Sequence, residues 1–185
     1  MVVRQRIPHL GDAPDDLAQS LQRAPISSMS PRPRIQQLAE HPDWLPIVAD
    51  WIYHQWWTAV EGASVVTLSD LLRSHLTLDQ MPLTLVASIN SRPVGTATLL
   101  AHDVGTERWP DLSPWFAALY VIPEYRHRGV GASLVHAAVS KAAALGVRVL
   151  HLSTIGREGF YAHLGWQVMH TGEGRVVMSK VVGKS

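Results

Sequence analysis

The stretch VIPEYRHRGVGASLV, residues 121–135, decides how the fold is read. A β-branched run ends at a proline, and Arg126, Arg128, Gly129 and Gly131 then precede small and apolar residues at helical spacing. A helix N-terminus has unpaired N–H groups and a partial positive charge, and both attract phosphate. Glycines allow an anion to approach the backbone closely. The stretch predicts a strand, a pyrophosphate-binding turn and a helix; a tight turn with solvated arginines is the alternative.

Two better-known phosphate loops do not fit this stretch. The P-loop requires a lysine directly after its last glycine, and none follows here. The dinucleotide fingerprint requires a third glycine and a place near the first strand of the domain. A different kind of phosphate site is therefore expected.

Composition limits the classes of protein. The chain has 185 residues, 46% hydrophobic and 17% charged, which suits a globular domain. The formal charge of +1 argues against a nucleic-acid partner. The absence of cysteine excludes disulfides and thiolate chemistry. No stretch is apolar enough for a membrane span or a signal peptide, and no histidine spacing suggests a metal site. We expect a cytoplasmic protein with no membrane partner.

The sequence predicts two regions. Residues 1–33 are expected to form a loosely ordered arm with a short helix at Asp15–Arg23, and residues 34–185 one domain. After Pro42, the apolar spacing predicts a helix, and Ser64–Thr67 should cap a second one. The residues expected on the buried face of the first helix are Trp44, Ile47, Val48, Trp51 and Ile52.

The remaining elements alternate between strands and helices. The second helix is predicted at Leu68–His75, and further helices are predicted at Gly129–Leu145 and Gly159–His163. Strands are predicted at Ile35–Leu38, Leu83–Ile89, Val94–His102, Phe116–Val121, Val147–Ser153, Trp166–His170 and Val176–Val181. This order predicts an α/β domain with a mixed sheet.

The hexapeptide at residues 126–131, RHRGVG, resembles motif A of the GNAT acetyltransferase superfamily, [QR]-x-x-G-x-[GA]. The preceding LYVIPEYR resembles the family's fourth strand, and FYAHLGWQV, residues 160–168, is similar to its Y-x-x-x-G-[FW] signature. The resemblance covers roughly residues 34–182. The pattern DWIYHQWW, PDLSPW, YAHLGW is similar to a group of bacterial GNAT proteins, some of whose relatives acetylate protein N-termini.

The resemblance implies a fold, a cosubstrate and a reaction. The GNAT fold has a mixed central sheet of about six to seven strands flanked by helices, and a bulge splays its two central strands, here Phe116–Val121 and Val147–Ser153. Acetyl-CoA would donate its acetyl group to a primary amine, either a small molecule, a peptide N-terminus or a lysine. The alternative is a non-catalytic acetyl-CoA sensor or interaction module. A monomer and a homodimer both remain open.

The resemblance also implies residue roles. The Val121 N–H would stabilise the thioester carbonyl, and Tyr161 would be the general acid for the CoA thiolate, unless its ring only packs. Many relatives have an asparagine where Thr154 stands, so Ser153 or Thr154 is left to hold the pantetheine arm. The expected acetyl-CoA contacts are Leu119, Tyr120, Val121, Arg126, His127, Arg128, Gly129, Val130, Gly131, Ala132, Ser153 and Thr154.

The general base and the acceptor site are less defined. His54, Glu61, His102, Asp103 and a water molecule are the candidates for the base. The acceptor is expected between Thr58–Val66 and His102–Pro114, where four tryptophans suggest an apolar pocket. These are Trp56, Trp57, Trp109 and Trp115; core packing explains Trp56 and Trp115 equally well.

Overall fold

The computed structural model describes residues 32–104, 106–172 and 174–183. Most of the predicted arm, including the helix expected at Asp15–Arg23, lies outside these residues. None of the described helices has the length and apolar character needed to cross a membrane.

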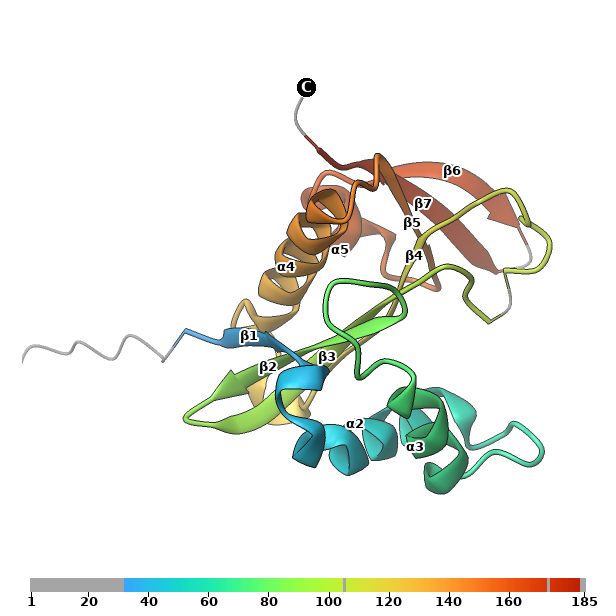
Figure 1. Ribbon diagram of the computed structural model, residues 1–185. Coiled ribbons are helices and arrows are strands. Elements are labelled where there is room, and N and C mark those ends of the chain that lie inside the picture. Colours follow the sequence, from blue (N-terminus) through green and yellow to red (C-terminus); the bar gives the residue numbers. More distant parts are fainter. Residues whose placement is uncertain (1–31, 105, 173, 184–185) are drawn as a thin grey trace, which may run out of the picture. The chain divides into compact units, whose positions relative to one another are not determined.

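Within the described residues, seven strands form one mixed sheet, as predicted (Figure 1). Their order is β1-β2-β3-β4-β5-β7-β6, and only the β4–β5 pair is parallel. Asn90 and Ser91 form the turn between β2 and β3, and both have positive φ, as the tight hairpin connection requires. The strands are β1 (Arg34–Gln37), β2 (Leu83–Ile89), β3 (Arg92–Leu100), β4 (Trp115–Val121), β5 (Val149–Thr154), β6 (Gln167–Gly172) and β7 (Arg175–Val181).

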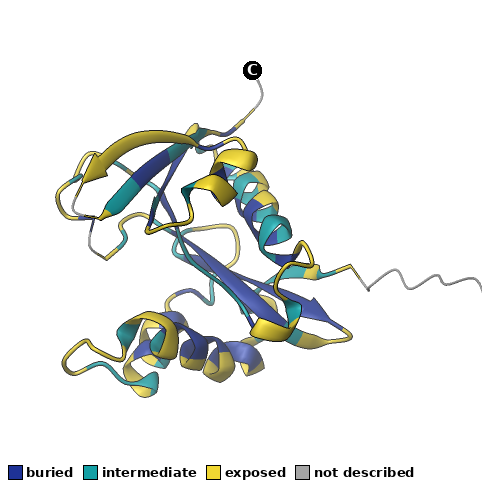
Figure 2. Cartoon of the chain, turned by 180° about the vertical axis from the view of Figure 1, so that it is seen from behind, coloured by how far each residue is buried: buried dark blue, intermediate teal, exposed yellow. Residues whose placement is uncertain are grey.

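Helices cover both faces of the sheet. On one face, α4 (Val130–Ala144) packs on β1 to β4, and on the other α2 (Leu45–Ile52) packs on β4 and on α3 (Val65–Arg73). Figure 2 shows the buried residues of the central strands between these two helical layers. The short helix α5 is formed by Glu158–His163. Single turns occupy Leu38–Glu40, Pro42–Trp44 and Pro123–Tyr125, and a π-helical turn, Tyr53–Trp57, follows α2.

The first helix buries a slightly different face from the predicted one. Trp44, Val48, Trp51 and Ile52 are buried as expected, but Ile47 is 40% exposed, so that part of the prediction is wrong. A 3-10 turn ends at Trp44, and the α-helix begins only at Leu45. At 100° per residue, Ile47 lies about 200° from Leu45, which faces the core.

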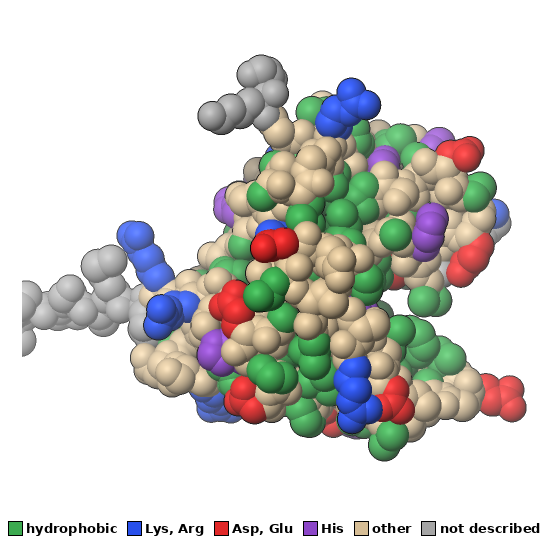
Figure 3. All heavy atoms as spheres, viewed as in Figure 1, with side chains coloured by type: hydrophobic (Ala, Val, Ile, Leu, Met, Phe, Trp, Pro, Cys, Tyr) green, Lys and Arg blue, Asp and Glu red, His purple; other side chains and the backbone are tan. Residues whose placement is uncertain are grey.

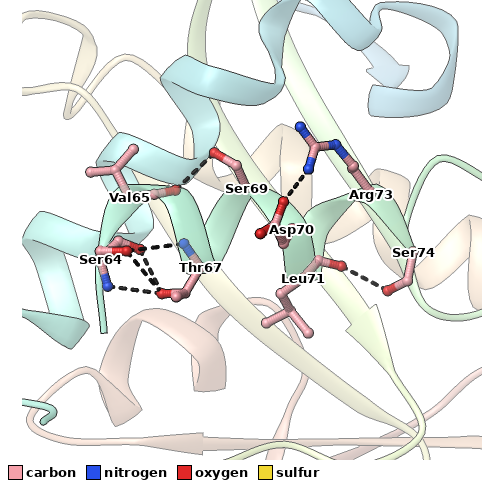
Figure 4. A network of polar contacts seen from close by, with 8 residues as sticks. All are labelled: Ser64, Val65, Thr67, Ser69, Asp70, Leu71, Arg73 and Ser74. Carbon is pink, nitrogen blue, oxygen red and sulfur yellow. Dashed lines mark hydrogen bonds and ion pairs between the residues drawn. The ribbon is translucent and has the colours of Figure 1, made fainter. Parts of the chain in front are cut away.

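The predicted cap of the second helix is confirmed (Figure 4). The Ser64 N–H donates to Thr67 Oγ1 over 2.8 Å, and the Thr67 N–H donates to Ser64 Oγ over 3.1 Å. This reciprocal capping box satisfies two backbone donors and starts α3 at Val65, three residues before the predicted start.

Candidate active site

A bulge in β4 separates the two central strands. Thr96 is opposite Tyr120 and Thr98 is opposite Ala117, so β4 has one extra residue between these pairs. Ala118 takes up the irregularity with a φ of 51°. Beyond it β4 leaves β5, and only Trp115–His151 and Phe116–Leu152 remain paired. The predicted bulge and splay are confirmed.

The splay exposes backbone groups at the end of β4. The Ile122 N–H donates to Val94 O over 3.0 Å, which makes Val121 and Gly95 a non-hydrogen-bonded pair of the β3–β4 ladder. The Val121 N–H and C=O therefore point toward β5, where β4 has lost its partner strand, and by alternation so do those of Leu119. The Val121 carbonyl accepts a hydrogen bond from Arg126 Nε at 2.8 Å.

The stretch at residues 126–132 forms a strand–turn–helix junction, as predicted. His127 and Gly129 have φ values of 58° and 80°, and Gly129 is the N-cap of α4. Within the described part of the chain, the backbone N–H groups of residues 127–132 have no hydrogen-bond acceptor. Alternating left- and right-handed residues ahead of a helix form a concave nest of N–H groups, which is a typical anion site. We call residues 126–132 the nest.

Basic side chains flank the nest. The Arg126 guanidinium lies 5.6 Å from the ring centre of Tyr120, and that of Arg128 lies 5.6 Å from the ring centre of Tyr125. Both arginines are exposed. They therefore place positive charge beside the nest while they stack on tyrosines.

The nest lies next to the gap between β4 and β5. A Cβ atom built on Gly131 would lie 3.6 Å from Phe160 Cζ and 3.9 Å from Val121 Cγ2. The first turn of α4 thus contacts both the end of β4 and α5. A glycine here leaves the path from the nest into the gap free of a side chain.

Tyr161 lies where β4 and β5 begin to separate. Its ring centre is 6.2 Å from that of Phe116, one of the last paired residues, and 6.1 Å from that of Trp166. Tyr161 is buried, and burial raises the pKa of its hydroxyl to about 12. The hydroxyl is therefore protonated at neutral pH.

The end of β5 presents its two polar residues to opposite faces. Leu152 pairs with Phe116, which contacts Tyr161 in α5, so Leu152 and Thr154 face α5. Ser153 faces the other way, and its Oγ accepts a hydrogen bond from Arg175 Nη1 at 3.1 Å. Sequence reasoning missed Arg175, because only the β5–β7 pairing brings it to this place.

The candidate bases differ in environment. His54 is exposed and its Nδ1 lies 2.9 Å from the carbonyl oxygen of Asp50, while Glu61 and His102 are also exposed. Asp103 is partly buried, and burial raises the pKa of its carboxyl group. No group of three or more His, Asp or Glu side chains in the described ranges could hold a metal ion.

The tryptophans do not form one wall. Trp115 is fully buried, and its Nε1 donates to Leu112 O over 2.7 Å, which makes it a core residue. Trp56 is 44% exposed, so core packing does not explain it. Trp57 is partly buried, and Trp109 stacks on His170 with ring centres 6.2 Å apart. Figure 3 shows the surface hollowed between the α2–α3 helices and the part formed by β5–β7, with hydrophobic side chains around the hollow.

Comparison with known proteins matches part of the chain to a family. The family described as "Acetyltransferase (GNAT) domain" matches residues 82–168. No curated protein sequence matches the chain.

Solved structures share the fold. An aminoglycoside 6'-N-acetyltransferase complexed with coenzyme A has 13% identity and a TM-score of 0.60, over 80% of this chain and 96% of that one. An acetyltransferase from Streptococcus agalactiae has 20% identity and a TM-score of 0.59, over 81% and 98%. N-acetylglutamate synthase from Neisseria gonorrhoeae, complexed with coenzyme A and N-acetyl-glutamate, has 15% identity and a TM-score of 0.60, over 82% of this chain and 36% of that one.

The family match runs from just before β2 to the start of β6, and so includes the nest, the β4 bulge and Tyr161. The match and the shared fold support an acetyl-CoA-dependent acyltransferase.

Proposed function

We propose that this protein is an N-acetyltransferase that transfers the acetyl group of acetyl-CoA directly to a primary amine in a ternary complex. The proposal depends on one observation: the nest is continuous with the unpaired backbone groups at the end of β4. The unpaired N–H groups of the nest lead past Gly131 to the peptide groups of Leu119 and Val121, in the gap where β4 leaves β5.

Each part of this path suits one part of acetyl-CoA. The N–H groups of the nest would hold the pyrophosphate, with Arg126 and Arg128 adding charge. Leu119 and Val121 would pair with the pantetheine arm as with an added strand. The Val121 N–H would then stabilise negative charge on the carbonyl oxygen under attack. Since Arg126 Nε donates to the Val121 carbonyl, Arg126 must share or leave this acceptor when pantetheine binds.

Tyr161 would act on the leaving group. Its hydroxyl is protonated at neutral pH because burial raises its pKa to about 12. It would donate a hydrogen bond to the developing thiolate and so stabilise the negative charge there. Complete proton transfer is less favourable, since an ordinary thiol is a stronger acid.

The acceptor would be a primary amine that enters through the hollow between α2–α3 and β5–β7 (Figure 3), beside the segment 102–114. A small amine, a peptide N-terminus and a lysine side chain are the three classes to test. The coenzyme A complexes of the two fold neighbours named above support the cosubstrate, and their names point first to small amines.

Thiol release tests the proposal. The protein is incubated with acetyl-CoA and, in turn, an aminoglycoside, glutamate, spermidine and a tripeptide with a free N-terminus. Amine-dependent release of CoA, with the acetylated product seen by mass spectrometry, is expected for at least one of them. Tight acetyl-CoA binding by calorimetry without transfer to any amine would instead favour a non-catalytic acetyl-CoA-binding module.

A further inference from the structure

A polar group lies on the face of the sheet opposite Tyr161. Ser153 is on this face at the end of β5, one residue beyond the last β4–β5 pair. Arg175 begins β7 on the same face, because it is two residues before Val177, the partner of Ser153. Its guanidinium is tied to Ser153 Oγ by the 3.1 Å hydrogen bond. A cation is therefore fixed beside the point where β4 and β5 separate.

The segment between β3 and β4 covers this face. His151 is on the same face as Ser153, and its Nδ1 lies 3.2 Å from Pro114 O while its ring contacts Trp115. Trp109 stacks on His170 of β6. Figure 1 shows the segment running beside the end of β6 and the start of β7. These contacts hold the segment at the edge of the hollow.

Asp103 is fixed within this segment. The Thr106 N–H and hydroxyl both donate to the Asp103 carbonyl, over 3.3 Å and 2.5 Å. The Val104 N–H donates to Asp103 Oδ1 over 2.8 Å. No ion pair shorter than 4 Å joins Asp103 to another described residue. The carboxylate is thus oriented and partly desolvated, but it is not neutralised by a close cation.

Two charged groups act on this carboxylate from a greater distance. Arg175 lowers the pKa of Asp103 and Glu107 raises it, while burial, the largest effect, also raises it. A base works best when its pKa approaches the working pH, so these surroundings suit proton transfer better than those of an exposed carboxylate.

We propose that Asp103 accepts the proton that the acceptor ammonium must lose, and that Arg175, held by Ser153, is the positioning residue that sets its charge environment. This inference rests on the proposed function. In the step, one N–H bond of the ammonium breaks and an O–H bond forms on Asp103. The freed nitrogen lone pair then forms the N–C bond to the acetyl carbonyl carbon as the C–S bond breaks. His54, Glu61 and His102 are exposed and so lack the partial burial of Asp103.

Asp103→Asn tests the base. The amide oxygen can still accept from Val104, so the segment should keep its shape. At pH 7, kcat/KM for whichever amine of the panel above reacts fastest should fall by about 10²- to 10⁴-fold, and the loss should shrink as the pH nears the pKa of the amine. Asp43→Asn, at an exposed carboxylate in the turn before α2 and outside this segment, is the control and should leave kcat/KM unchanged.

The charges of Arg175 and Glu107 should shift the pKa of Asp103 in opposite directions, and this can be measured without any enzyme activity. Carboxyl-carbon NMR of the protein without substrates should show the pKa of Asp103 higher in Arg175→Met and lower in Glu107→Gln than in the parent. The acidic limb of the curve of kcat/KM against pH should move to higher pH in Arg175→Met and to lower pH in Glu107→Gln. In Arg175→Lys the limb should lie at the same pH as in the parent.

The outcomes separate the two proposals. Full activity of Asp103→Asn at pH 7, or an acidic limb that neither charge variant moves, would overturn the role of Asp103 and leave acetyl transfer standing. Failure of the parent protein to acetylate any amine of the panel would overturn both.

Discussion

At the residue scale, Tyr161 can be tested by removing one oxygen atom. Tyr161→Phe keeps the ring contacts with Phe116 and Trp166 but removes the donor to the thiolate. Turnover should fall by about 10²- to 10⁴-fold while the affinity for acetyl-CoA persists, because the bond matters chiefly as charge develops on sulfur. Steady-state kinetics with the amine found by thiol release measures this, with Tyr53→Phe as the control. Turnover within about threefold of the parent would assign Tyr161 a packing role.

Individual residues were predictable where they belong to a contiguous motif. Gly129, Gly131 and Tyr161 stand in such motifs, and the structure places all three around one gap. Arg175 is in no motif. Its relation to Ser153, 22 positions earlier, arises only when β7 pairs with β5, and nothing in the local sequence specifies that pairing. Asp103 was one of four equal candidates until burial distinguished it from the three exposed ones.

At the element scale, the first turn of α4 is the place to test phosphate binding. A methyl group at Gly131 would make only ordinary contacts with Phe160 and Val121, so Gly131→Ala should fold. Gly131→Glu should also fold, but it adds bulk and negative charge where the pyrophosphate must approach. Calorimetry should show a loss of acetyl-CoA affinity of at least about 100-fold, or roughly 3 kcal/mol. Unchanged affinity in a folded Glu variant would contradict the phosphate role of the nest.

Strand β3 carries a second glycine with a different, purely steric requirement. A Cβ on Gly95 would lie 2.7 Å from the Tyr120 carbonyl oxygen and 3.3 Å from Leu134 Cδ1. Backbone cannot yield as a flexible side chain can, so Gly95→Ala should destabilise the fold by about 1–3 kcal/mol. Urea denaturation measures this, with Gly159→Ala as the control because its Cβ would meet no atom within 4 Å. Equal stability of parent and Gly95→Ala would show that β4 can shift at no cost.

Element types were easier to predict than element boundaries. Short apolar and β-branched runs predicted every described strand, because a strand shows its pattern within a few residues. The start of α2 was misjudged because the 3-10 turn at Pro42–Trp44 continues the apolar spacing without continuing the α-helix, and Ile47 consequently faces solvent. The β4 bulge came from the family resemblance alone. No glycine marks it, and Ala118 adopts the positive φ.

At the scale of the whole molecule, a buried polar chain links the helical layer to the sheet. His75, two residues after α3, places Nδ1 2.9 Å from Thr84 Oγ1 in β2, and Thr84 Oγ1 lies 3.1 Å from Thr98 Oγ1 in β3. All three side chains are buried. Buried hydroxyls and imidazoles need such partners, because an unpaired one costs about 1–3 kcal/mol. The layers are therefore joined by polar bonds around an imidazole whose charged form is disfavoured by burial.

Acid should weaken this link. Burial lowers the pKa of His75 from 6.5 to about 4. Between pH 4 and pH 6.5 the unfolded chain therefore binds a proton at this side chain, whereas the folded protein does not. Stability is complete above pH 6.5 and falls as the pH drops toward 4, by at most about 3 kcal/mol. Urea denaturation at pH 7.5, 5.5 and 4.5 measures the loss. His75→Gln, which can still bond Thr84 but does not titrate, should flatten the curve; a residual slope of the same sign comes from His151, whose pKa burial also lowers. If the free energy of unfolding fell equally steeply with pH in the parent and in His75→Gln, His75 would not be the cause of the loss.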